Sequence, residues 1–197
     1  MKRREILTLV LMALILVPPT LKLVGKDPPP VAQLPPAPEP ARPAPPATPR
    51  AWFEALRARC TPVDARLATD LNPPPAGAEG TGYKAACYAL AGQVPTARAL
   101  LLGLPDEERP DGVGPVRDVT RELSAEGRHD QAGALAELVL EFWPDDEVAL
   151  YEAGLGRWAS GDRTGARVYL ERFLERHAAD DEWSENAREM LRQADEA

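Results

Sequence analysis

The 197-residue chain is long enough for one packed domain with accessory segments, and its charge is unevenly distributed. Residues 1–50 contain 7 Lys or Arg against 3 Asp or Glu, whereas residues 51–197 contain 16 against 28. A duplex-binding surface needs a basic stripe that displaces counterions, so this acidic part argues against nucleic acid as a partner.

The first 27 residues have the pattern of a membrane-directed segment. Three cations stand within Met1–Arg4, before an almost wholly apolar run, Ile6–Val17, and further apolar residues follow at Leu21–Val24. The stretch Ile6–Val24 nearly matches the roughly 20 residues that a helix needs to cross a bilayer. We therefore predict a transmembrane helix, with a cleaved signal peptide and a buried core helix as alternatives.

The residues that follow the apolar run separate these alternatives. Cleavage needs small residues just beyond the run, but Pro18–Leu21 occupies that place. A core helix would have nothing to pack against, because a proline-rich stretch comes next. A signal anchor is thus favoured, and the cations before it place Met1 on the cytoplasmic side of the inner membrane. This orientation predicts a periplasmic, or otherwise extracytoplasmic, carboxyl-terminal part.

Residues 28–49 form a proline-rich linker with eleven prolines. Fixed φ angles and missing N–H donors favour extended polyproline II, which at about 3.1 Å per residue reaches on the order of 70 Å. We interpret the linker as a spacer; a ligand for an aromatic groove on another protein is the alternative.

Residues 50–77 are predicted to form an irregular helical pair, over Pro49–Cys60 and Pro62–Leu71. Cys60 and Cys87 are the two cysteines of the chain. An oxidising compartment makes their pairing plausible, and a disulfide would tie this helical pair to the helical pattern around Cys87. The alternative is two buried, unpaired thiols that act as small hydrophobic residues.

A repeated pattern begins near residue 78. Similar segments occur at Gly92–Ala97, Gly127–Ala132 and Gly161–Ala166, so the pattern recurs about every 34 residues. Each Gly ends one helical pattern and precedes another, while the Ala that closes the segment is small enough for close helix approach. The spacing therefore predicts three helix-turn-helix units in an all-α fold.

At these positions the chain resembles the tetratricopeptide repeat family, whose unit is about 34 residues long. The matching residues are Ala85, Tyr88, Gly92 and Ala97 in the first unit, Gly127, Ala132 and Pro144 in the second, and Gly154, Gly161 and Ala166 in the third. The resemblance spans about Ala78–Asp180 and implies a solenoid of about three repeats. A last amphipathic helix over Glu182–Leu191 has the polar outer face of a capping helix, so residues 78–197 form one domain.

The folded part shows no motif for catalysis, for a metal or for a cofactor. HExxH, CxxC, a phosphate-binding glycine loop and a nucleophile elbow are all missing. The acidic runs Asp145–Glu147 and Asp180–Glu182 fall between helices, where acids complement the positive end of the following helix. We therefore predict no catalytic residues, no metal site, no cofactor and no enzymatic activity.

The resemblance implies a concave surface, lined by the first helix of each unit, that holds a peptide or helix of a partner. The groove-facing positions of the family correspond here to Arg117, Arg121, Tyr151, Leu155 and Trp158, a set able to grip a carboxylate and an apolar side chain. Tyr151 and Trp158 fit a core position equally well.

These features favour a membrane-tethered adaptor or scaffold that binds another protein in the cell envelope. A structural subunit of a membrane complex, assembled through the transmembrane segment, is the first alternative. A small hydrolase with an unrecognised site is the second.

Overall fold

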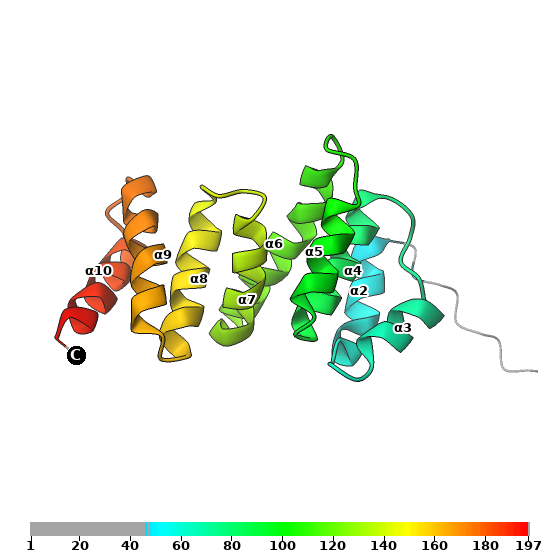
Figure 1. Cartoon of the computed structure of the whole chain (residues 1–197), viewed down its shortest axis with the longest axis horizontal. Helices are drawn as coiled ribbons and strands as arrows, with labels where there is room; N and C mark the ends of the chain where they lie inside the picture. The colour runs from blue at the N-terminus through cyan, green and yellow to red at the C-terminus, as the bar shows by residue number, and fades with distance from the viewer. Residues whose placement is uncertain (1–45, 47, 197) are drawn as a thin grey trace, which may run out of the picture. The chain divides into compact units, whose positions relative to one another are not determined.

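The computed structural model describes residues 46 and 48–196, and within this range the chain is helical without any strand (Figure 1). The all-α prediction is therefore confirmed for the described part. The membrane-directed segment, residues 1–27, and nearly all of the linker, residues 28–49, lie outside the described residues. No helix in the described part combines the length and apolarity that a membrane span requires.

Short α-helices follow one another with brief turns between them. Those in the described range are α2 (Pro49–Leu56), the 3-10 turn η1 (Arg57–Arg59), α3 (Ala65–Leu71), α4 (Ala78–Leu90), α5 (Val94–Leu102), α6 (Arg109–Ala125), α7 (His129–Leu140), α8 (Glu147–Ala159), α9 (Arg163–Arg176) and α10 (Glu182–Asp195).

The turns α4–α5, α6–α7 and α8–α9 share one geometry. Gly92, Gly127 and Gly161 have φ angles of 73°, 74° and 83°, a region that glycine enters without steric cost. The residue after each glycine donates its N–H to the carbonyl five residues earlier, at 2.9 Å in all three turns. This 6→1 bond belongs to the Schellman motif, which satisfies helix-end carbonyls and reverses the chain. The repeated glycine thus produces three helical hairpins.

The hairpins stack in chain order, as Figure 1 shows for α4 to α9. Helix α4 packs against α6 and α6 against α8, while α5, α7 and α9 each pack against the first helix of their own hairpin. The interface between them is filled by fully buried side chains: Leu101, Val113, Val116, Val119, Leu123, Leu135, Leu138, Leu150, Leu170 and Phe173. Full burial stabilises each such side chain by about 1.5–3 kcal/mol, so the hairpins depend on their neighbours for stability.

Two glycines let α7 and α8 approach to backbone contact. A Cβ atom added to Gly156 would lie 2.6 Å from the Cα of Gly133, and one added to Gly133 would lie 2.7 Å from the Cα of Gly156. The same added Cβ on Gly156 would lie 2.9 Å from the carbonyl oxygen of His129. This close crossing brings the start of α7 beside the middle of α8, where Glu152 is located.

The row of helices is closed at both ends by additional helices. Helix α2 packs on α4 and buries Trp52 and Phe53, and the Cys60–Cys87 disulfide joins the segment after η1 to α4. At the other end α10 packs on α9 and starts with a capping box, in which Asp181 and Ser184 exchange hydrogen bonds. Asp146 likewise caps α8 by accepting from the Ala149 N–H at 2.9 Å.

Candidate functional site

A groove of about 820 Å³ lies on this helical domain. Helices α6, α8 and α10 supply most of its lining. The apolar part of the lining consists of Val148, Tyr151, Leu155, Trp158, Trp183 and Met190. Charged side chains contribute at Arg50, Asp118, Arg121, Glu122 and Glu152, and the lining is completed by Ser124, Ala125, His129, Ala159 and Asn186. The groove therefore offers an apolar floor with charges of both signs around it.

Four of the five residues predicted for a partner-binding groove line this one. They are Arg121, Tyr151, Leu155 and Trp158. Arg117 is absent from the lining, and its Nε atom lies 2.7 Å from the Asp146 Oδ2 atom. That pair connects α6 to the amino-terminal end of α8, so Arg117 has a structural partner and is not available at the groove.

Tyr151 belongs to the floor and to the core at once. Its side chain is only 6% exposed, and its ring centroid lies 5.1 Å from that of Phe173 and 5.0 Å from that of Trp183. The Asn186 side-chain amide donates to the Tyr151 hydroxyl at 2.7 Å. Burial raises the pKa of Tyr151 above its ordinary value of 10.0. Tyr151 thus holds α10 in place beside the groove.

Trp158 is half-buried at the other end of α8. The Arg163 guanidinium lies over the indole, with Cζ 3.5 Å from the ring centroid, and Arg163 also donates to the Trp158 carbonyl at 2.9 Å. This cation–π contact orients the indole along the groove wall. Tyr151 therefore lies mostly in the core, whereas Trp158 forms a partly exposed wall of the groove. The core position and the groove position that were both considered for these residues each apply to one of them.

Glu152 and His129 also line the groove, and neither was among the residues predicted for it. Glu152 is 4% exposed, and its Oε2 atom finds no hydrogen-bond partner among the described residues; the same holds for His129 Nδ1. Burial raises the pKa of Glu152, while Ser124 and His129 act in the opposite direction. The sequence could have indicated that Glu152 lines the groove, because a helical period places position 152 on the same helix face as Val148 and Leu155.

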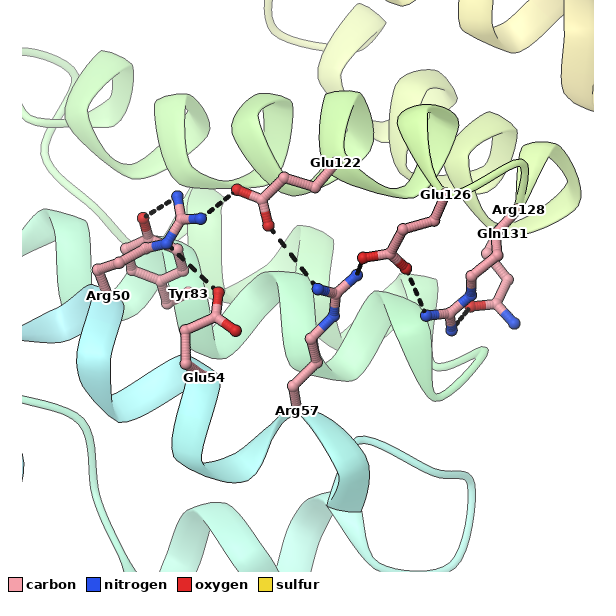
Figure 2. Close-up of polar contacts among 8 residues, drawn as sticks. All are labelled: Arg50, Glu54, Arg57, Tyr83, Glu122, Glu126, Arg128 and Gln131. Carbon is pink, nitrogen blue, oxygen red and sulfur yellow. Dashed lines mark hydrogen bonds and ion pairs between the residues drawn. The ribbon is translucent and has the colours of Figure 1, made fainter.

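A chain of ion pairs joins α2 and η1 to α6, as Figure 2 shows, and its members Arg50 and Glu122 line the groove. Arg50 pairs with Glu122 and with Glu54, and Arg57 Nη2 lies 2.7 Å from Glu126 Oε1. Arg128 continues the chain, with Nη1 3.1 Å from Glu126 Oε2. Hydrogen bonds from Arg128 and Arg57 lower the pKa of Glu126. These pairs fix α2 against α6, and they occupy Arg50 and Glu122.

A smaller acidic hollow adjoins the groove along α10. It shares Tyr151, Trp183 and Asn186 with the groove and adds Glu182, Glu185 and Glu189. The acidic character of this face agrees with the negative charge of the whole carboxyl-terminal part.

No group of three or more His, Cys, Asp or Glu side chains in the described part is arranged to hold a metal ion.

Comparison with known protein families, with curated proteins and with solved structures found no match in any of the three.

Proposed function

We propose that this chain is a tetratricopeptide-like interaction module that holds a segment of a partner protein in the groove between α6, α8 and α10. The observation that carries the proposal is the composition of the groove. Its lining includes aromatic and aliphatic side chains from three helices, among them the partly exposed Trp158 and Trp183, and charged side chains surround this apolar surface. Tryptophan, tyrosine and arginine are the residues most often responsible for binding energy at protein interfaces.

The repeated hairpins support the tetratricopeptide part of this proposal. Three Schellman turns, at Gly92, Gly127 and Gly161, follow one another at intervals of about 34 residues. A helical hairpin of about that length is the unit of the family, and its stacked first helices supply the binding surface. Here α6 and α8 are first helices of their hairpins, and both line the groove.

The proposal includes a tether to the inner membrane, with the helical domain on the periplasmic side. Its support is the sequence pattern of residues 1–27, followed by the proline-rich linker. An alkaline phosphatase fused after Val24 should be active, and a reporter that works only in the cytoplasm should be inactive there. The reverse pattern would overturn the exported location and leave the groove proposal standing.

The groove itself is tested by affinity capture with the full chain from the native envelope. The Arg121→Glu/Trp158→Ala variant should lose a protein that the wild type retains, because both side chains line the groove. Val168→Ala is the matched control, since Val168 is 52% exposed on α9 and outside the lining. Equal capture by all three chains would overturn the proposal.

A further inference from the structure

We propose that the segment bound in the groove presents a Lys or Arg side chain to Glu152; this inference rests on the proposed function and specifies its partner. The starting observation is a buried carboxyl group without a counter-ion. Glu152 is 4% exposed, Oε2 has no hydrogen-bond partner, and no ion pair involving Glu152 is found among the described residues. Buried charged groups are normally paired, so an exception in a groove indicates a missing partner.

The two arginines that line the groove do not pair with Glu152. Arg50 is engaged by Glu122, Glu54 and the Tyr83 hydroxyl. Arg121 lines the groove as an exposed residue, and no hydrogen bond or ion pair joins it to Glu152. His129 is the remaining titratable neighbour, and its Nδ1 atom is itself buried without a partner. Glu152 thus lines the groove with Ser124 as a hydrogen-bonding neighbour and without an ion-pair partner among the described residues.

The walls beside Glu152 suit the stem of a long cationic side chain. Leu155, Trp158 and Met190 provide apolar surface along the same groove. Lys and Arg bury their methylene groups against such surface while the charged end seeks a carboxylate or an aromatic face. A guanidinium on Trp158 is already found within the molecule, contributed by Arg163.

The charges around the groove favour a cationic segment over an anionic one. Asp118 lies on the rim, and the adjoining hollow adds Glu182, Glu185 and Glu189. Arg121 is the one lining cation of the described part without an ion pair, and it accommodates an acidic residue elsewhere on the segment. Burial raises the pKa of Glu152, and a cation beside the carboxyl group would lower it again.

Three matched peptides test this inference: acetyl-Ala-Leu-Xaa-Leu-Ala-amide with Lys, norleucine or Glu at Xaa. Norleucine keeps the apolar stem of Lys and removes its charge. Each peptide is titrated into the isotope-labelled full chain, and the backbone amide shifts of Glu152, Leu155 and Gly156 report binding. The Lys peptide should bind on the order of tenfold more tightly than the norleucine peptide, and the Glu peptide should bind least.

Glu152→Gln should reduce the affinity of the Lys peptide to that of the norleucine peptide. Glu175→Gln is the matched control, because it removes an exposed carboxylate of α9 outside the groove lining and should leave the Lys preference intact. If Glu152→Gln does not fold, as judged from its amide spectrum, the three peptides on the wild type still decide the question.

The outcomes separate this inference from the proposed function. Equal shifts by the Lys and norleucine peptides would overturn the role of Glu152 while supporting an apolar binding groove. A Lys preference that survives Glu152→Gln would also overturn it. If none of the peptides shifts the groove amides at millimolar concentration, the groove is not a peptide site and both proposals fail.

Discussion

The two ends of the helical row are closed by different chemistry. At the amino-terminal end, α2 and the segment after η1 are attached by the Cys60–Cys87 disulfide and by the ion pairs that run from Arg50 to Arg128. At the carboxyl-terminal end, α10 is attached by stacked rings and by hydrogen bonds, among which His177 links Glu147 to Asp181. Both ends also share features, since Phe53 stacks on Tyr83 at the amino-terminal end and Arg167 pairs with Asp195 at the other. The disulfide distinguishes the amino-terminal end, called here the covalent end, from the carboxyl-terminal end around Tyr151 and Trp183, called here the aromatic end.

The groove between the two ends receives a different wall from each of them. The covalent end fixes Arg50 and Glu122, whereas the aromatic end contributes Trp183 and Met190. Local opening is governed by the weakest contacts of a segment, so α10 should open more readily than α2. The groove therefore has one rigid wall and one wall that can adjust to a partner.

The largest expected effect comes from breaking the covalent end. Cys60→Ala/Cys87→Ala removes a cross-link between residues 27 apart, which should lower the free energy of unfolding by about 3 kcal/mol. Urea unfolding of the full chain measures this, with the reduced wild type as control. A loss below about 1 kcal/mol would show that packing of Trp52 and Phe53 alone holds this end.

At the aromatic end, Trp183→Ala should weaken the docking of α10 by about 1.5 kcal/mol, because it removes the ring stacked on Tyr151. Hydrogen exchange should accelerate for the amides of α10 and remain unchanged for those of α4. Val168→Ala, on the exposed face of α9, serves as the control. Uniform acceleration across both helices would contradict an independently opening end.

The ion pairs should contribute less than either feature. Glu122→Gln removes the partner shared by Arg50 and Arg57 and should cost about 0.5 kcal/mol at low salt, since partly exposed pairs are screened. Glu185→Gln is the matched control, because Glu185 has no ion pair among the described residues. A cost for Glu122→Gln that persists at high salt would mean that the pair acts through packing and not through charge.

The smallest expected effect is a pH dependence at the α10 end. Two hydrogen bonds raise the pKa of His177 above its ordinary 6.5: the one to Glu147 contributes most, and the one to Asp181 contributes next. Because the pKa of His177 is raised in the folded state, its protonated form stabilises the protein, and this contribution is fully present below pH 6.5. The contribution is lost as the pH rises through the folded-state pKa. Exchange of the α10 amides, corrected for its intrinsic pH dependence, should therefore speed up above neutral pH, and His177→Gln should abolish this trend.

The turns could be predicted from the sequence because they depend on local chemistry. A Gly at the end of each helical pattern suffices for the reversal, and Gly92, Gly127 and Gly161 all adopt the positive φ that such a turn needs. The predicted last helix begins at Glu182, as α10 does, because Asp181 provides a strong amino-terminal cap.

The groove was harder to predict because it depends on contacts between distant residues. Arg117 lies on a first helix, as expected, but pairs with Asp146, which caps the first helix of the next hairpin. The charge of Glu152 predicts an exposed side chain. The side chain is nevertheless buried, near the close crossing of α7 and α8 at Gly133 and Gly156. The contribution of α10 to the groove follows from tertiary packing, which no local pattern reveals.

Site-specific photo-crosslinking in living cells tests the central claim, that the groove holds a partner protein, most directly. A benzoylphenylalanine in place of Trp158 or Trp183 reports from the groove, and one in place of Leu102 or Val168 reports from exposed sites outside it. We predict one light-dependent adduct of the same mass from both groove positions and from neither control position. Identical adducts from all four positions, or no adduct from Trp158 and Trp183, would contradict this claim.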